Sequence, residues 1–194
     1  MLDIEPCAVA AVAAAGDFFD MPALTALLAA AAVHELGHVM CLAALGVHIS
    51  GFRVEAQGLC IEYSGTAPAW AHALAAFCGP AAGIACAFLF SALSRRFAGG
   101  WPALAAGFSL LLSLFNFLPI PPLDGSKIFN AVLPEKIYFK IMKYEQFIFI
   151  ALIALVYSGL LDKPLGFLQG KVTDVMIFLT NWVDIIFSAV LNKV

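Results

Sequence analysis

The stretch Val33-His34-Glu35-Leu36-Gly37-His38-Val39 carries the pattern His-Glu-x-x-His inside a long apolar run. On a helix, residues four apart project from one face about one turn apart, so His34 and His38 can face one metal ion together. This spacing is typical of zinc sites in which the adjacent glutamate, here Glu35, is the general base for a metal-bound water. The alternative, two core histidines in a chance match, is disfavoured. Ionisable residues at membrane depth cost at least ~2.5 kcal/mol on insertion scales, so their presence indicates function.

The composition is that of a membrane protein. Of the 194 residues, 63% are hydrophobic and 12% are charged, whereas soluble domains average about 45–50% apolar and about 25% charged residues. The net charge of −3 offers no basic surface for nucleic acid, and the five cysteines lack the spacing of a disulfide framework or a zinc knuckle. Asp3 and Glu5 stand where a secretory signal would be basic. We therefore expect an integral membrane protein with one domain, residues 1–194. Its expected partners include the lipid bilayer and exclude nucleic acid.

Five apolar segments could contribute to a membrane domain, since a helix needs about 20 residues to cross. They are residues 21–46, 70–93, 101–118, 147–161 and, more weakly, 172–190. Polar residues that share one helical face interrupt the last segment, namely Asp174, Asn181, Asp184 and Ser188. That segment either turns this face to the bundle or lies flat on the membrane. Residues 7–15 are too short to cross, and they form either an interfacial segment or the remnant of a span.

Between the first two spans the pattern changes. Apolar residues in 47–65 recur with a period near two, and Gln57-Gly58 is a possible turn, which predicts a β-hairpin or extended loop at the membrane edge. His48 in this segment fits a surface or structural histidine better than a metal ligand. The predicted fold class is therefore an all-α polytopic membrane protein with a short β-hairpin after the first span. The first three apolar segments lie within residues 21–130, and one or two accessory helices follow within residues 138–194.

A catalytic zinc usually has three protein ligands, and Asp124 is the best candidate for the third. It follows the proline-broken end of the third span, in Pro119-Ile120-Pro121-Pro122-Leu123-Asp124-Gly125. If three spans cross in turn, the first and third run in the same direction, so Asp124 comes to a depth similar to that of the two histidines. The alternative is an ordinary turn residue before glycine. The third span also carries Ser109, Ser113 and Asn116 along one face, which indicates a polar interior that can line a water path.

The sequence resembles the site-2 protease family of intramembrane zinc metalloproteases. Besides His34-Glu35-Leu36-Gly37-His38, the stretch Asn116–Gly125 fits that family's pattern N-x-x-P-x-P-x-x-D-G at each fixed position. Gly79-Pro80-Ala81-Ala82-Gly83 resembles its central-helix motif G-x-x-x-[N/S/G], although many members have Asn where Gly83 stands. The resemblance covers residues 21–130 and implies a three-helix catalytic core there, in a compact, sporulation-type-like member without a PDZ or CBS domain.

The resemblance also assigns roles to residues. It implies zinc bound by His34, His38 and Asp124, with Glu35 as the catalytic base. Substrate-binding candidates are Asn116, Gly79 and Gly83. The implied reaction is hydrolysis of a peptide bond in or near a transmembrane segment of a membrane-protein substrate. Such a helix must partly unwind before attack, and the backbone of 119–123 or the edge of the hairpin is placed to pair with it.

Two other classes of function fit parts of the pattern. A membrane metal-binding or transport protein would use the same ligands without proteolysis, but it would not require Glu35 beside the first ligand. A packing subunit that has lost catalysis is disfavoured because the ligands and the base are all present. The positive-inside rule slightly favours a bacterial cell membrane with the active site near the cytoplasmic leaflet. It then places five basic residues inside, Arg53, Lys127, Lys136, Lys140 and Lys143, opposite Arg95, Arg96, Lys163 and Lys171.

Overall fold

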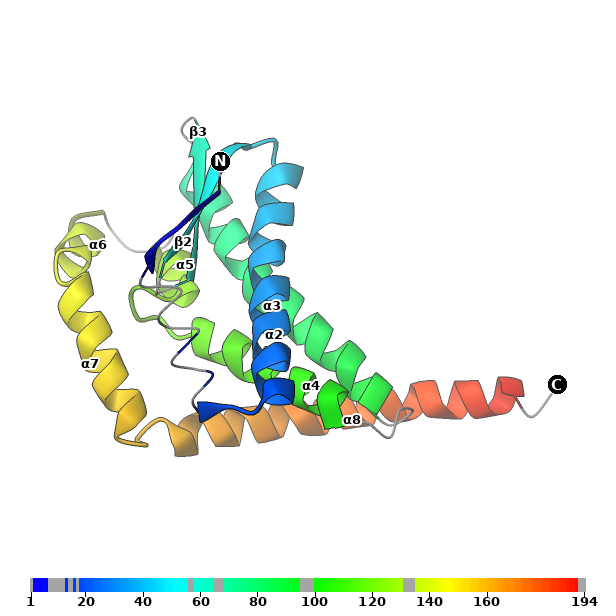
Figure 1. Ribbon diagram of the computed structural model, residues 1–194. Coiled ribbons are helices and arrows are strands. Elements are labelled where there is room, and N and C mark those ends of the chain that lie inside the picture. The colour runs from blue at the N-terminus through cyan, green and yellow to red at the C-terminus, as the bar shows by residue number, and fades with distance from the viewer. Residues whose placement is uncertain are drawn as a thin grey trace.

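The computed structural model describes residues 2–6, 13, 16, 18–55, 58–64, 68–94, 100–130 and 135–191. Its elements are, in chain order, β1 (Leu2–Ile4), α2 (Met21–Ala44), β2 (His48–Glu55), β3 (Gly58–Ser64), α3 (Ala69–Ser94), α4 (Gly100–Asn116), α5 (Asp124–Asn130), α6 (Glu135–Met142), α7 (Glu145–Tyr157) and α8 (Asp162–Leu191). Helices α2, α3 and α4 pack against one another, the sheet lies at one end of this bundle, and α8 crosses the other end (Figure 1). The predicted mostly helical membrane fold with a hairpin after the first helix is confirmed.

Helix α2 begins where the sequence supplies a cap. The Asp20 carboxylate accepts a hydrogen bond from the Ala23 backbone N–H at 3.0 Å, and Pro22 occupies the first turn. The buried face of the helix consists of residues three and four apart, namely Ala23, Ala26, Ala30, His34, Gly37, His38 and Leu42. Because most of these side chains are small, neighbouring helices can approach closely. The two histidines therefore face protein and not lipid.

The described chain contains two helices that are long and apolar enough to cross a membrane, or three if a bent pair counts as one span. The two are α2 and α3, while α4, with 17 residues, is a shorter apolar helix. The bent pair is α7 followed by α8, with an angle of 79° between them. The predicted third span is thus shorter than expected, and the fourth segment ends at Tyr157. The chain is an integral, multi-pass membrane protein.

Helix α8 differs from the predicted fifth segment, because it begins at Asp162 and not at residue 172. Pro164 does not interrupt it, since a proline in the first helical turn removes an N–H that has no helical partner there. Leu165, Val172 and Met176 pack against side chains of α3 and α4. Asp174 and Asn181 are exposed. The described polar residues therefore do not turn toward the bundle, and the alternative that this segment lies flat on the membrane stays a prediction.

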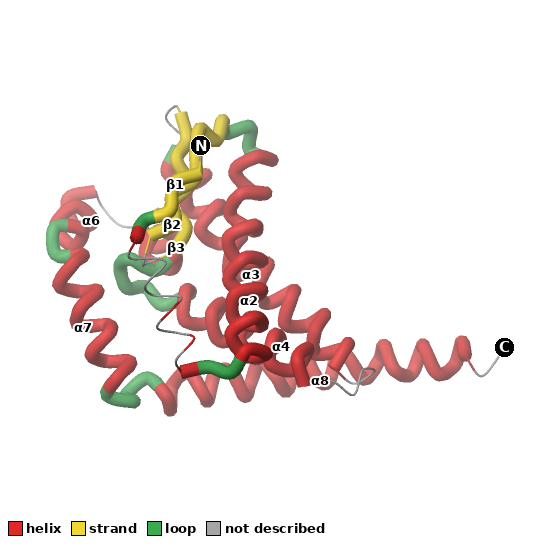
Figure 2. The backbone as a smooth tube through the Cα atoms, in the orientation of Figure 1, coloured by secondary structure: helices red, strands yellow, loops and turns green. Residues whose placement is uncertain are grey.

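The predicted hairpin is confirmed, and it belongs to a sheet of three strands (Figure 2). Strands β2 and β3 are antiparallel, with Phe52 opposite Ile61. Strand β1 pairs with β2 in parallel, which the sequence did not indicate because three residues carry no pattern. His48 is exposed, as expected. Gln57 of the predicted turn and most of residues 7–15 lie outside the described residues.

The predicted polar stripe of α4 faces the protein interior. Ser109 and Ser113 are buried, and the Ser113 hydroxyl donates to the Ser109 carbonyl at 2.7 Å. A Cβ added to Gly83 of α3 would meet the Ser113 hydroxyl, so the two helices are in close contact here. These two serines therefore contact α3 and do not face an open water path.

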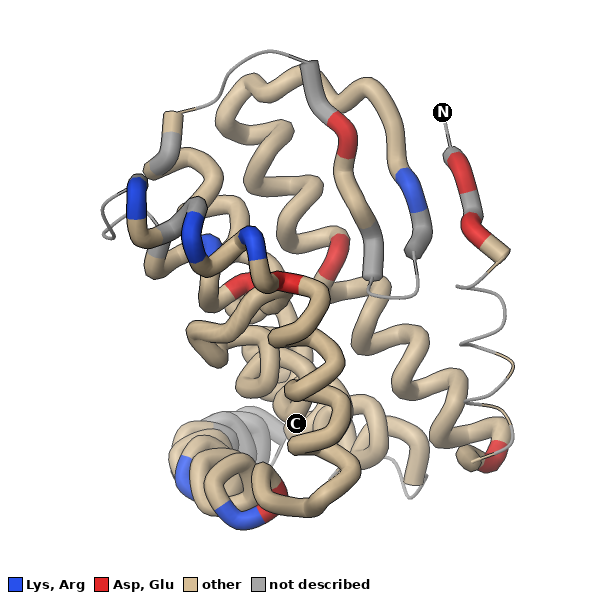
Figure 3. Tube along the Cα trace, turned by 90° about the vertical axis from the view of Figure 1, so that its left-hand side faces the viewer, with Lys and Arg blue, Asp and Glu red and all other residues tan. Residues whose placement is uncertain are grey.

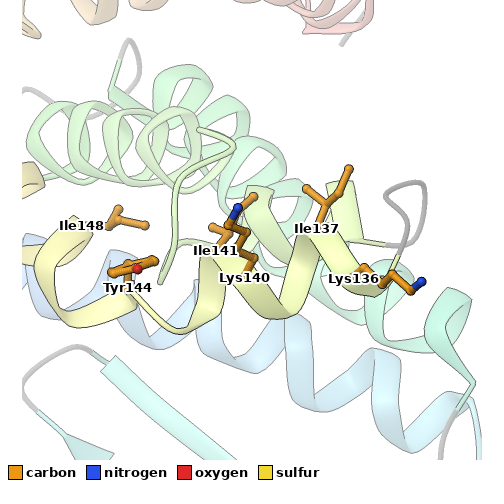
Figure 4. A pocket seen from close by; sticks show the side chains of 6 residues that line it. All are labelled: Lys136, Ile137, Lys140, Ile141, Tyr144 and Ile148. Carbon is orange, nitrogen blue, oxygen red and sulfur yellow. The ribbon is translucent and has the colours of Figure 1, made fainter.

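Beyond the bundle, α6 and α7 form a separate arm (Figure 1). A groove of about 620 Å³ lies where the two helices meet, and Figure 4 shows the side chains around it, Lys136, Ile137, Lys140, Ile141, Tyr144 and Ile148. The described cysteines are free thiols; Cys60 on β3 is exposed, whereas Cys41, Cys78 and Cys86 are half-buried.

Candidate metal centre

Three side chains from distant parts of the chain meet at one point. The Nε2 atoms of His34 and His38 each lie 3.0 Å from Oδ2 of Asp124, and they lie 3.2 Å from each other. All three residues are buried, with exposed fractions of 3%, 8% and 6%. The sequence prediction that Asp124 reaches the two histidines is therefore confirmed. Among the described residues, these three form the group that can hold a metal ion.

The donor set fits zinc. Nδ1 of His38 lies 2.7 Å from the carbonyl oxygen of Ala75, so this nitrogen carries the proton and donates it, because a carbonyl only accepts. With its proton on Nδ1, a neutral His38 has its Nε2 lone pair available to a metal ion, and the Asp124 carboxylate faces the same point. A tetrahedral zinc with bonds of about 2.0–2.2 Å places its ligand atoms ~3.3 Å apart, close to the triangle observed here.

Helix α3 fixes the orientation of His38 through close contact with α2. A Cβ on Gly37 would lie 2.6 Å from the Cys78 carbonyl oxygen and 2.7 Å from the Ala82 Cβ. A Cβ on Gly79 would overlap the His38 imidazole. Both positions thus require glycine. The ring of His38 lies against Gly79 on one side, and its Nδ1 is hydrogen-bonded one turn earlier on α3, a support that metal-binding histidines commonly have.

The predicted helix break before Asp124 is confirmed. Helix α4 ends at Asn116, residues 117–123 form turns, and α5 begins at Asp124. The Leu123 N–H donates to the Ile120 carbonyl at 2.9 Å, which closes the last of these turns. A Cβ on Gly125 would collide with the carbonyls of Phe117 and Leu118, so the turn packs directly on the start of α5. The carboxylate therefore approaches the histidines from a short, rigid segment.

Two groups at the site were missed by the sequence prediction. Nζ of Lys127 lies 2.9 Å from Oδ1 of Asp124, the oxygen that does not face the histidines. The spacing i, i+3 at the start of a helix was an available signal for this pair, but Lys127 was considered only for membrane orientation. No pattern in the sequence indicated the Ala75 carbonyl, because the packing of the helices decides which backbone carbonyl accepts the hydrogen bond from His38.

The remaining candidates are distributed around the site. Glu35 is half-buried on α2, directly after His34. Gly79 lies against His38, whereas Gly83 lies one turn further along α3 against Ser113. The Asn116 side-chain amide donates to the Leu112 carbonyl of its own helix at 2.9 Å. The structure thus brings Gly79 next to the ligands and places Gly83 at the contact with α4.

Comparisons with known proteins agree with this geometry. No family model matches the sequence. Rip3 of Mycobacterium tuberculosis, whose name describes a zinc metalloprotease, is 36% identical over 117 residues in two strains. The match covers 55% of this chain and 30% of the relative, so the chain spans less than a third of that relative's length.

One solved structure has a similar architecture. The Site-2 Protease from Methanocaldococcus jannaschii matches with a TM-score of 0.64 over 92% of this chain and 88% of that chain, at 20% identity. At this level of identity the match establishes the fold and leaves the chemistry to be argued from the residues.

Proposed function

We propose that the chain is a zinc metalloprotease of the site-2 protease type, whose fold it shares, and that it hydrolyses a peptide bond in or near a transmembrane segment of another membrane protein. The observation that carries the proposal is the buried group of His34, His38 and Asp124 in a chain built for the membrane. Because the curated relatives are much longer than the matched part, activity and substrate are proposals for this chain.

We assign the three buried side chains as the zinc ligands and Glu35 as the catalytic base. These three side chains would hold a zinc ion, which would lower the pKa of a bound water toward ~7 and polarise the scissile carbonyl. Glu35 accepts the proton from the water and passes it to the leaving amine. Its position directly after His34 on α2 and its half-buried side chain support this role.

We assign the substrate contacts to Asn116, Gly79 and Gly83. Gly79 supports this assignment by its contact with His38, and Asn116 by its place at the end of α4, just before the turn that carries Asp124. Gly83 has less support, since its contact is with Ser113. A helical substrate hides its carbonyls in i→i−4 hydrogen bonds, so a short part of it must unwind at these residues before attack.

We also propose one catalytic domain, with a core of residues 21–130 and accessory helices within 138–194. Its active site would lie near the cytoplasmic leaflet of a bacterial cell membrane. The distribution of basic residues supports this orientation, because Figure 3 shows them in separate groups. Lys127, Lys136 and Lys140 belong to α5 and α6, whereas Lys163 and Lys171 belong to α8 at the far end of α7. The positive-inside rule then favours a cytoplasmic site.

The test is cleavage by the purified protein in nanodiscs. A panel of single-span membrane proteins, each labelled at both ends, is incubated with wild type and with Glu35→Gln, with and without a zinc chelator. We expect at least one substrate to be cut by wild type alone, with activity lost on chelation and restored by zinc. Zinc-loaded wild type that cleaves none of them, but carries metal across proteoliposomes, would overturn the proposal in favour of transport.

A further inference from the structure

The two oxygens of the Asp124 carboxylate have different partners. Oδ2 lies 3.0 Å from Nε2 of each histidine, whereas Oδ1 lies 2.9 Å from Nζ of Lys127. The carboxylate is 8% exposed and the Lys127 side chain is 54% exposed. Lys127 therefore reaches from the surface to a buried ligand, and the two oxygens are not equivalent.

Both residues lie on α5, three positions apart. Residues at this spacing are neighbours on a helix, so Lys127 can hold Asp124 without help from the rest of the bundle. The recorded ion pairs of the described chain include neither Lys136 nor Lys140, although both are exposed lysines on the next helix. The contact with Asp124 is thus particular to Lys127 and is not shared by the basic residues around it.

A carboxylate can bind zinc through one oxygen or through both. When both oxygens bind, the second oxygen is added to the three ligand atoms and the water, which raises the coordination number to five and crowds the position that a catalytic site keeps open for water. An ammonium group on Oδ1 opposes this, because that oxygen would have to leave a charge-assisted hydrogen bond. It also opposes rotation of the carboxylate, which would exchange the two oxygens.

We propose that Lys127 is a positioning residue that restricts Asp124 to binding the metal through Oδ2 alone, and so keeps a coordination position free for water. This inference rests on the zinc site of the proposed function. Lys127 acts through Asp124 and has no assigned contact with the reacting atoms. If Lys127 served only the stability of the fold, its loss would have a small effect, because partly exposed ion pairs contribute little to stability. In that case, loss of Lys127 would leave the metal site unchanged.

The test compares Lys127→Met with Lys127→Arg and with Lys140→Met in the full chain. Zinc affinity is measured by chelator competition. Coordination is followed by visible absorption after replacement of zinc with cobalt(II), since four-coordinate cobalt absorbs much more strongly than five-coordinate cobalt. For Lys127→Met we expect about 10-fold weaker zinc binding, the low end for changes in groups that support metal ligands, and weaker cobalt absorption. Lys127→Arg and Lys140→Met should resemble wild type.

The outcomes separate the two proposals. Wild-type affinity and an unchanged cobalt spectrum in Lys127→Met would overturn the role of Lys127 and leave the zinc site intact. Wild type that binds neither zinc nor cobalt would overturn both. Should Lys127→Met fail to fold, Lys127→Gln takes its place, because it keeps a hydrogen-bond donor without the charge. The cobalt absorption of Lys127→Gln should then be weaker than that of wild type. A wild-type spectrum would contradict the proposal.

Discussion

Helices α2 and α7 are both apolar, but they are held in place in different ways. In α2, seven residues are buried, and the contact with α3 is so close that Gly37 and Gly79 have no room for a Cβ. In α7, Leu152 is the buried residue, while Phe147 and Tyr157 are 71% and 85% exposed. Both helices satisfy their backbone internally, as lipid requires. An apolar sequence is therefore enough to form a helix such as α7. Placing the histidines of α2 also needs a surface on α3 that fits closely against it.

The largest effect should come from removing a ligand that this packing positions. His34→Ala or Asp124→Ala should abolish stoichiometric zinc binding and all cleavage, because two remaining ligands hold the metal poorly. Metal analysis of the purified protein by mass spectrometry measures this. Asp174→Ala, an exposed carboxylate on α8, is the matched control and should keep its zinc. Full zinc content in Asp124→Ala would remove that residue from the ligand set.

The second-largest effect should come from a change at Glu35 that alters the chemistry of the site and leaves its packing unchanged. Glu35→Gln keeps the size of the side chain and removes the proton acceptor, so zinc content should remain while turnover falls about 10²-fold or more. Single-turnover cleavage with zinc quantified in the same sample gives both values. A variant that cleaves at the wild-type rate would show that another group activates the water.

Gly79→Ala tests the close contact itself. One methyl group would overlap His38, so the ring must move and lose its hydrogen bond to Ala75. We expect zinc affinity to fall about 10–100-fold, the range for changes in groups that support metal ligands. Gly107→Ala on α4 is the control, because a Cβ there meets no atom within 4 Å. Equal affinities for the two variants would mean that α3 does not position His38.

The smallest effect compares the two helices directly. Ala30→Leu in α2 enlarges a residue that is 1% exposed, which should destabilise the protein by about 1–3 kcal/mol. Ala151→Leu in α7 makes the same change at an exposed position and should alter stability by less than about 0.5 kcal/mol. Unfolding in mixed micelles with increasing denaturing detergent measures both. Similar values would show that α7 is packed as tightly as α2.

The sequence predicted the parts of the molecule that depend on local signals. The spacing of His34 and His38 predicted two members of the buried group, and the prolines before Asp124 predicted the helix break that precedes the third. The hairpin followed from its period of two. These predictions needed the order and direction of the spans, but no knowledge of which helices contact one another.

The features that were missed depend on tertiary contacts. The direction of α8 is set where Val172 and Met176 meet α3 and α4, and nothing in the spacing of apolar residues states which neighbour they contact. The overlap of Gly79 with the space next to His38 likewise depends on a helix crossing. Lys127 is visible in the sequence three residues after Asp124, but which of the two carboxylate oxygens it contacts depends on where the histidines lie.

The parallel pairing of β1 with β2 has a consequence for biosynthesis. Leu2 pairs with Phe52, Asp3 with Arg53 and Ile4 with Val54, so each partner is made 50 residues later (52 − 2, 53 − 3, 54 − 4). At about 5–20 residues per second, β1 waits several seconds after its own synthesis, while α2 enters the membrane. Strand β1 is therefore without its partner β2 during this time. The sheet becomes complete only after the helix that carries both histidines has been made.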